Sequence, residues 1–464
     1  MSIYLYGGKI VGEESVRAGN ILIRDEKIAE ILPSDEPIPR GVNDAFDVSG
    51  KLIMPGVIDA HTHYALASRG TETREDFLSG SRAASCGGVT LFIDFSPHLE
   101  EKPLPVSARS RIEKADKQSV IDFHLHQTVH NYSSSIEEQL SEIRSMGISS
   151  IKVFTTYKEA GYMVEVGDRK PLLEACRRAK LLPTVHAEDD KFIREAREKM
   201  IQEKGGVDEL SMQDHPDLRP AGAEAKAIKK LGRIAAELEM PLYFDHVSSS
   251  AGLKEVEKLR QRGAIIAAET APHYLFLDRS CFKGSDAEKY FMVPPLRERV
   301  DCLSLKKALV NGKIDVVATD HCAYAREQKA RQMHPLKMLP GIPGSETLLS
   351  LMHELMVNRR DLSYTQLSQV LSKNPARFFG LYPERGKIAV SSAADIVVFD
   401  PDLERELKQE NLHSRAGYSP YDHLTVRGYP VMTIARGEVV MKDGNPEASG
   451  GRGRFVRAGA SCLF

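Results

Sequence analysis

The sequence has no excess of charge of either sign, and this excludes one broad class of function. Its 464 residues include 63 basic and 65 acidic side chains, giving a formal net charge of −2. Because proteins that bind nucleic acid or anionic membranes usually carry a basic excess, we expect neither partner. The most basic stretch contains Arg452, Arg454 and Arg457 among glycines, and we expect a solvated terminus there.

Long apolar runs and paired cysteines are also missing. No run approaches the roughly 18 residues needed to span a bilayer. The first residues, MSIYLYGGKIVG, lack a cationic leader and a long apolar core, so we expect no signal peptide. The six cysteines are scattered without paired spacing. Free thiols in a reducing cytosol explain this better than a disulfide framework, which predicts a cytoplasmic protein.

The middle of the chain contains a regular alternation of two patterns. Short runs rich in β-branched residues mostly alternate with helical segments such as 136–145, 172–180 and 223–239. There are eight such runs, at 57–61, 89–95, 121–129, 150–155, 182–186, 242–247, 264–269 and 314–320. The alternation predicts a parallel sheet, and eight units are the number that closes a (β/α)8 TIM-type barrel. A doubly wound open sheet is the alternative.

The two ends of the chain have a different pattern. Residues 1–52 and 394–441 alternate short apolar and polar stretches with Gly and Asp, which is typical of short strands. Neither end is long enough to make a sheet confidently alone, so we expect both ends to pair in one small β-domain. The predicted organisation is 1–52 as its N-terminal part, 53–384 as the barrel, and 385–464 as its C-terminal part with a tail.

Residues that bind metals lie near the carboxyl ends of the predicted strands, where barrel active sites form. They are His61 and His63 on the first strand, Lys152 on the fourth, His186 on the fifth, His246 on the sixth and Asp320 on the eighth. Imidazole and carboxylate suit zinc and related divalent ions. Thiolates are absent from the set, which favours a catalytic site over a closed structural one.

The number of ligands indicates two metal ions. Four histidines and one aspartate are too many for one open four-coordinate zinc, and they suit two ions about 3.5–4 Å apart if an anion bridges them. A lysine ammonium has no lone pair and cannot bridge. Deprotonated by its surroundings and carboxylated by CO2, Lys152 would carry a carbamate with two oxygens. The apolar context of Lys152 motivates this hypothesis.

These motifs resemble those of the cyclic amidohydrolases, within the amidohydrolase superfamily. Residues 54–95 resemble the family's opening, and later motifs follow in the family's order over essentially the whole chain: IKVFTTYK, TVHAEDD, DHVSSSAG, ETAPHYLFLD, PPLRERVD, DVVATDHCAY, NPARFFGLYPERGKI and ADIVVFDP. The chain is most similar to the D-hydantoinase and dihydropyrimidinase branch. Dihydroorotases carry an arginine two residues after the HxH motif, where this chain has Ala65.

The resemblance implies a metal-bearing barrel with a β-sandwich built from both chain ends, usually in a homotetramer. It implies two divalent ions, with zinc as the first choice, and a small cyclic ureide as substrate. It also divides the ligands between the ions, with carboxylated Lys152 as the bridge: His61, His63 and Asp320 bind the more buried ion, and His186 and His246 bind the second.

The activity that the resemblance implies is opening of hydantoin or dihydropyrimidine rings to N-carbamoyl amino acids. Asp320 is the predicted catalytic base, and Tyr157 is predicted to stabilise the developing oxyanion. Two expected substrate contacts depart from the family. Val293 replaces a usual serine, and Pro340, which has no N–H to donate, replaces a usual asparagine. The alternatives are an allantoinase-like hydrolase and a non-catalytic scaffold resembling the dihydropyrimidinase-like proteins of neuronal signalling, which lack metal ligands.

Several other residues compete for a place in the site. His124 and His126 form a second HxH motif, which we interpret as packing residues because the metal set is already complete. His273 follows the seventh strand and is a candidate to approach the pocket. His321 should point away from it, because neighbouring residues on a strand face opposite sides. For Arg297, substrate positioning and pairing with acids both stay open.

Overall fold

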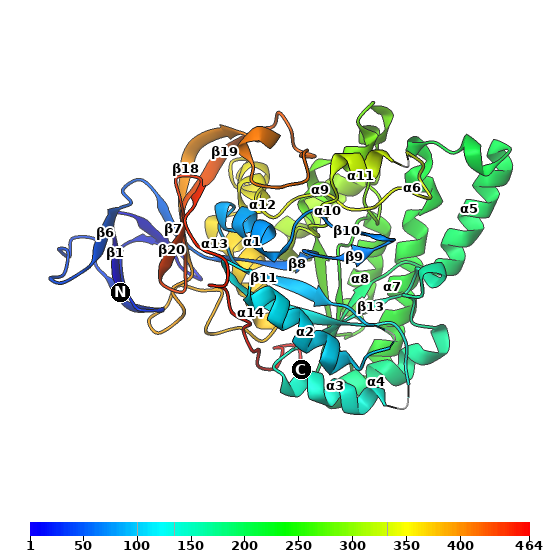
Figure 1. Ribbon diagram of the computed structural model, residues 1–464, viewed down its shortest axis with the longest axis horizontal. Coiled ribbons are helices and arrows are strands. Elements are labelled where there is room, and N and C mark those ends of the chain that lie inside the picture. Colours follow the sequence, from blue (N-terminus) through cyan, green and yellow to red (C-terminus); the bar gives the residue numbers. More distant parts are fainter. Residues whose placement is uncertain (100, 134, 332) are drawn as a thin grey trace.

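Eight parallel strands form the centre of the molecule, with helices around them (Figure 1). The structure is a computed structural model that describes residues 1–99, 101–133, 135–331 and 333–464. In spatial order the strands are β17 (Val316–Val317), β16 (Ile266–Thr270), β15 (Leu242–Phe244), β14 (Leu182–His186), β13 (Ser150–Phe154), β12 (Asp122–Val129), β11 (Val89–Ser96) and β8 (Val57–Thr62). Each of the eight predicted runs contributes one strand.

The first and last strands of this sheet meet, which closes it into a barrel. Thr62 at the end of β8 pairs in parallel with His321, just beyond β17. The backbone N–H and the hydroxyl of Thr319 both donate to the buried carboxylate of Asp59, at 3.0 and 2.6 Å. An open doubly wound sheet has no contact between its edge strands. The predicted (β/α)8 barrel is therefore confirmed.

Long amphipathic helices cover the barrel. They are α1 (Phe77–Cys86), α2 (Leu104–Asp116), α3 (Ile136–Ser145), α4 (Arg169–Ala179), α5 (Asp190–Lys204), α7 (Ala221–Glu237), α8 (Ser250–Gln261) and α10 (Arg299–Val310). The three helical segments expected from the sequence correspond to α3, α4 and α7. In α7, Ile228, Leu231 and Ala235 recur at helical spacing and are buried, so the helix holds the barrel by one apolar face.

Shorter helices occupy the connections. They are α6 (His215–Leu218), α9 (Pro272–Phe276), α11 (Arg326–Ala330), α12 (Leu348–Met352), α13 (Tyr364–Ser368) and α14 (Asn374–Phe378). A two-stranded hairpin, β9 (Ala67–Ser68) and β10 (Thr71–Glu72), follows β8. Within the described ranges, no helix combines the length and hydrophobicity that crossing a membrane requires.

Two further sheets lie beside the barrel, and one of them joins both chain ends (Figure 1). The four-stranded sheet has the order β5 (Lys27–Leu32), β4 (Asn20–Arg24), β1 (Ser2–Tyr6), β6 (Asp44–Asp47). The seven-stranded sheet has the order β21 (Asn445–Pro446), β20 (Glu438–Lys442), β19 (Thr425–Ala435), β18 (Ile396–Glu406), β7 (Leu52–Pro55), β2 (Lys9–Val11), β3 (Val16–Ala18). Ile3 and Ile23 of one sheet share a buried cluster with Ile53 and Val398 of the other. The domain boundaries at residues 52 and 385 stay a prediction.

The backbone of the basic C-terminal segment packs against the barrel, so the prediction of a solvated terminus was wrong for the backbone, although the side chains of Arg454 and Arg457 are exposed. Phe455 pairs in parallel with Phe123 of β12. The backbone of Phe123 donates to Arg454 O at 3.1 Å and accepts from Val456 N at 2.8 Å. A Cβ atom on Gly453 would lie 2.1 Å from Ile121 O, so only glycine fits this close approach. Backbone pairing holds the segment in place, and its charge pattern gave no sign of that pairing.

A buried ion cluster joins the barrel to the seven-stranded sheet. Arg385 donates to Asp122 of β12 at 2.7 Å and also to Asp395, which immediately precedes β18. Arg436, just beyond β19, donates to Asp122 at 2.8 Å. No side chain of these four is more than 9% exposed. Charges buried to this degree depend on their partners.

We expect Arg385→Met to lower the free energy of unfolding by about 3–5 kcal/mol, because two buried carboxylates lose a cationic partner. Urea unfolding followed by circular dichroism measures this. The matched control is Arg109→Met, which removes an arginine paired with Glu142 where both side chains are about half exposed; its cost should stay below about 1 kcal/mol. Equal effects of the two substitutions would contradict the role of the buried cluster.

Candidate active site

A cavity of about 340 Å³ lies at the carboxyl ends of the barrel strands. The structure brings all the metal, catalytic and substrate residues predicted from the sequence to its lining: His61, His63, Lys152, Tyr157, His186, His246, Val293, Asp320 and Pro340. Residues far apart in the chain meet here because parallel strands end at the same rim.

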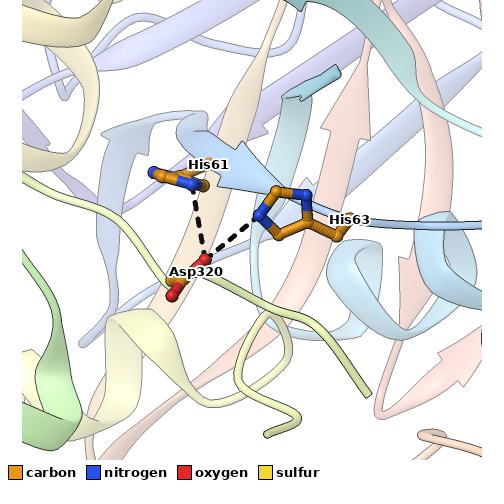
Figure 2. A group of neighbouring side chains, drawn as sticks. All are labelled: His61, His63 and Asp320. Carbon is orange, nitrogen blue, oxygen red and sulfur yellow. Dashed lines mark ion pairs between the residues drawn. The ribbon is translucent and has the colours of Figure 1, made fainter. Parts of the chain in front are cut away.

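The first group of metal-binding atoms comes from β8 and the segment after β17. The Nε2 atoms of His61 and His63 lie 3.3 and 3.2 Å from the same Oδ1 atom of Asp320 (Figure 2). Both histidines point to one side of β8, as the two-residue period of a strand requires. The buried Nε2 of His61 has no hydrogen bond of ordinary geometry. An unsatisfied nitrogen beside a carboxylate fits a divalent ion.

Charge states in this group suit metal binding. Burial and the nearby charge of Lys152 hold the pKa of His61 well below its usual value, so the imidazole is neutral. Its Nδ1 lies 2.9 Å from Glu269 Oε1. In the tautomer in which Nδ1 donates to Glu269, the Nε2 lone pair is free to bind a metal ion. Burial opposes ionisation of Asp320, but the hydrogen bond from His63 outweighs it, so the pKa of Asp320 is lowered.

The second group is formed by His186 at the end of β14 and His246 after β15. His186 Nδ1 lies 3.1 Å from His246 Nε2. The other ring nitrogen of His186 lies 2.7 Å from Glu188 Oε2. Burial disfavours the ionised form of Glu188, but Arg219 and His186 keep its pKa below the usual range. Glu188 therefore orients His186 so that its Nδ1 lone pair faces His246.

Lys152 of β13 is fully buried but is not in a purely apolar setting, which corrects the reading of its sequence context. Its Nζ donates to Asp245 Oδ2 at 2.6 Å. The rings of Phe95 and Phe154 lie 5.0 and 5.2 Å from the same nitrogen. Burial raises the pKa of Asp245, and the charge of Lys152 lowers it in part. Asp245 is therefore a potential proton acceptor for the lysine.

Sequence reasoning missed two carboxylates in this region. Asp245 and Glu269 form, with His61, another group whose ligand atoms all lie within 4.8 Å of one another. The signal was present, because Asp245 opens the DHVSSSAG motif and Glu269 opens ETAPHYLFLD, each near the carboxyl end of a strand. Glu269 also accepts from the Tyr243 hydroxyl at 2.7 Å. It acts as a support that orients His61 rather than as part of the cavity lining.

Tyr157 projects into the cavity from the turn after β13. Its backbone has a φ of 66°, in the left-handed region. Its ring lies 5.2 Å from that of His186, and the Arg219 guanidinium lies 5.0 Å from the ring centroid. Burial raises the pKa of Tyr157 to about 12. The hydroxyl is therefore protonated at neutral pH and available as a hydrogen-bond donor.

The two segments that carry Val293 and Pro340 are tied together by a residue that sequence reasoning missed. Lys329 of α11 is fully buried, and its Nζ donates to Phe291 O at 3.1 Å and Gly341 O at 2.7 Å. Gly341 N also donates to Phe291 O at 2.9 Å. Burial lowers the pKa of Lys329 to about 7. Its third partner is the Tyr418 hydroxyl at 3.3 Å, and nothing in the sequence context of Lys329 indicates that it binds two backbone carbonyls.

The second HxH motif serves packing, as expected. Both ring nitrogens of His124 and of His126 have partners: the hydroxyls of Ser149 and Ser150, Ala60 O, and Val456 O of the C-terminal segment. The expectation for His321 is also confirmed. Its Nδ1 accepts backbone N–H bonds from the segment at residues 344–345, which is outside the cavity lining.

His273 and Arg297 also lie outside that lining. His273 is buried and its Nε2 has no hydrogen-bond partner, and burial lowers its pKa to about 4, so the ring is neutral at neutral pH. Arg297 donates to Ser248 Oγ at 3.0 Å and to Arg219 O at 2.5 Å. Its Nη2 also lies 4.0 Å from Glu224 Oε2, so of the two roles left open for Arg297 the structure supports pairing with acids.

The two ligand groups are neighbours, since the ring centroids of His61 and His246 lie 5.4 Å apart. Neutral imidazoles, an ionised carboxylate and a buried lysine at one rim fit a pair of divalent ions better than a single ion. In His61 and His186 the second ring nitrogen lies next to a carboxylate, which is typical of histidines that bind a metal ion. The arrangement can activate a water molecule and polarise a carbonyl group.

The chain is similar to curated hydantoinases over its whole length. It is 32% identical to the D-hydantoinase of Ralstonia pickettii over 461 residues, covering 98% of this chain and 99% of that protein. It is 30% identical to the D-phenylhydantoinase of Escherichia coli (strain K12 / DH10B) over 464 residues, covering 98% of each. Each comparison leaves almost no part of either chain unmatched.

Solved structures of hydantoinases and dihydropyrimidinases are also similar to this chain over its whole length. The dihydropyrimidinase from Brevibacillus agri NCHU1002 superimposes with a TM-score of 0.95 at 29% identity, covering 100% of each chain. The L-hydantoinase (dihydropyrimidinase) from Arthrobacter aurescens gives a TM-score of 0.88 at 26% identity, covering 98% of this chain and 99% of that one. The model of the Amidohydrolase family matches residues 52–440, which include every barrel strand and every lining residue named above. On this match and on the site that it spans, the chain belongs to the amidohydrolase family.

Proposed function

We propose that this chain hydrolyses cyclic amides, opening hydantoin or dihydropyrimidine rings to N-carbamoyl amino acids. One observation carries the proposal: two neighbouring groups of metal-binding atoms and the protonated hydroxyl of Tyr157 line the same cavity. Relatives named D-hydantoinase and dihydropyrimidinase, which match the chain over nearly its full length, support it. The non-catalytic alternative is disfavoured because all six predicted ligand residues are present together.

The cofactor that we propose is a pair of divalent ions, with zinc as the first choice. The residues that would hold it are His61, His63, Asp320, His186, His246 and Lys152 carrying a CO2-derived carbamate. Loss of a proton from Lys152 precedes carboxylation, and Asp245 at 2.6 Å is placed to accept that proton. When bound, such ions lower the pKa of a water molecule toward neutrality and polarise the substrate carbonyl.

The residues of the chain then have defined tasks. Asp320, which is ionised and lies at the junction of the first ligand group, accepts the proton of the attacking water at a carboxylate oxygen and returns it to the leaving ring nitrogen. A carboxylate of low pKa is a weak base, so its position next to the reacting atoms must carry this step. Tyr157 donates its hydroxyl hydrogen to the carbonyl oxygen as negative charge develops there.

We also propose a cytoplasmic homotetramer. The tetramer rests on the family resemblance alone. The cytoplasmic location is supported by the six cysteines, all of which are free.

A substrate panel tests the reaction. We expect the zinc-loaded protein to hydrolyse hydantoin, 5-phenylhydantoin or dihydrouracil with a kcat/KM at least tenfold higher than that for allantoin or dihydroorotate. Release of N-carbamoyl products, followed by chromatography, is the measurement. A chelator should abolish turnover and zinc with bicarbonate should restore it. Preferential hydrolysis of allantoin would support the allantoinase-like alternative, and absence of bound metal after metal-replete purification would support the scaffold.

Asp320→Asn tests the base. The amide keeps the size of the side chain but cannot accept a proton in the same way, so we expect kcat to fall by about 10²–10⁴-fold, the usual scale of general acid–base catalysis. Elemental analysis must accompany the kinetics, because Asp320 is also a proposed ligand. Near-normal turnover by a variant with two bound ions would remove this role from Asp320.

Tyr157→Phe tests the oxyanion contact. Removing one donor of this kind typically lowers kcat by about 10²–10³-fold, and we expect a loss on that scale with little change in metal content. The matched control is Tyr162→Phe, since Tyr162 lines the same cavity and has no role in the proposed reaction. Equal losses in the two variants would show that the hydroxyl of Tyr157 has no special part in the reaction.

A further inference from the structure

The cavity has a positive charge near its opening that the proposed reaction does not use. Arg69 lies in the turn between β9 and β10 and lines the same cavity as His61 and Asp320. His61 is buried, whereas Arg69 is exposed. The guanidinium therefore lies toward the solvent end of the cavity, and the ligand groups lie at its buried end.

The hydrogen-bond capacity of Arg69 is largely unused. Its Nη1 donates to Met338 O at 3.2 Å, and a guanidinium carries five N–H donors. Among the residues that the structure describes, no acidic side chain forms an ion pair with Arg69. Asp320, at the buried end, is the one carboxylate in the cavity lining as described. A guanidinium in this position has donors and charge to offer an anion.

The turn that presents Arg69 is well supported. Arg69 and Gly70 have φ values of 50° and 75°, two left-handed residues in succession, as in a type I′ hairpin. The strands on either side pair in register. The side chain of Gln328 donates to Thr71 Oγ1 at 2.8 Å and to Glu72 O at 3.1 Å. The hairpin is thus anchored to α11, which limits the freedom of Arg69.

The other walls of the cavity provide few groups that could bind an anion. Outside the ligand groups they are largely apolar or aromatic, with Leu66, Phe154, Met292 and Tyr162 among them. Lys152, the other basic side chain of the lining, is paired with Asp245 and carries no positive charge once it is carboxylated as proposed. A carboxylate attached to the substrate would therefore find its cationic partner at Arg69.

We infer that the substrates of this chain are cyclic ureides whose ring bears a short flexible side chain ending in a carboxylate, and that Arg69 binds this carboxylate. The inference rests on the proposed function and names its substrate class. The ring lies at the buried end, against the ligand groups and Tyr157, while the side chain extends toward the opening. Arginine suits this contact because its planar fork binds a carboxylate through two hydrogen bonds.

The test compares two compounds of nearly equal shape that differ in charge, 5-(2-carboxyethyl)hydantoin and 5-(2-carbamoylethyl)hydantoin. For the zinc-loaded protein we expect a kcat/KM about tenfold or more higher for the acid, mainly through KM, as for a hydrogen bond to a charged group. In Arg69→Gln the acid-to-amide ratio should fall to about one, and in Arg69→Glu it should fall below one. Arg69→Lys should keep part of the preference, and added salt should reduce it.

A matched control is Lys158→Gln. Lys158 is an exposed cation that is paired with Glu165 and is absent from the cavity lining. Its removal should leave the acid-to-amide ratio unchanged. An equal fall of the ratio in this variant would show a general effect of surface charge and would overturn the contact assigned to Arg69.

Measuring the binding of both compounds by calorimetry distinguishes a failure of this inference from a failure of the proposed function. If neither ring is opened but the acid binds more tightly than the amide, and Arg69→Gln removes the difference, the contact between Arg69 and the carboxylate holds and the proposed function fails. If both rings are opened at equal kcat/KM, or the preference for the acid persists in Arg69→Gln, the inference is overturned and the proposed function stands. Equal binding without hydrolysis overturns both.

Discussion

Closure of the barrel between its first and last strands is the constraint on which the site depends. His61 lies on β8, His63 directly follows it, and Asp320 follows β17. These three side chains meet only because the two strands are neighbours. The contact is held by the bridge from Thr62 to His321 and by two hydrogen bonds from Thr319 to the buried Asp59. If the sheet stayed open at this seam, the first ligand group would be split between two edges. The contact between the first and last strands therefore positions the active site as well as closing the barrel.

The second requirement is electrostatic. Burial keeps the imidazoles of His61, His186 and His246 neutral. In two of these rings, a carboxylate next to one nitrogen favours the tautomer in which the other nitrogen can bind a metal ion. Glu269 does this for His61, and Glu188 does it for His186. A neutral ring with its lone pair aimed inward is a ligand, whereas a protonated ring is not. The site is therefore preorganised by residues that need not touch substrate.

Much of this arrangement could be predicted from the sequence. The eight strands follow from alternating runs of apolar residues, and the predicted metal ligands line one cavity because their positions at strand ends determine where they meet. What could not be predicted depends on contacts without a local pattern. Lys329 donates to two backbone carbonyls that belong to other segments. The segment around Phe455 is held by backbone pairing, while its composition indicated exposure. Asp245 was visible as a motif residue, but its pairing with Lys152 depends on how β13 and β15 sit in the barrel.

The division of the cavity into a buried and an exposed end explains why reaction and substrate range can vary separately. At the buried end every ligand side chain lies on or directly after a barrel strand, so its position follows from the sheet. At the other end the lining comes from connections, namely the hairpin with Arg69 and the segments with Val293 and Pro340. Lys329 holds the segments with Val293 and Pro340 through their backbone carbonyls, so the side chains of these segments can change without loss of its hydrogen bonds. Val293 and Pro340 can therefore depart from the residues expected there while the residues proposed for chemistry keep their places.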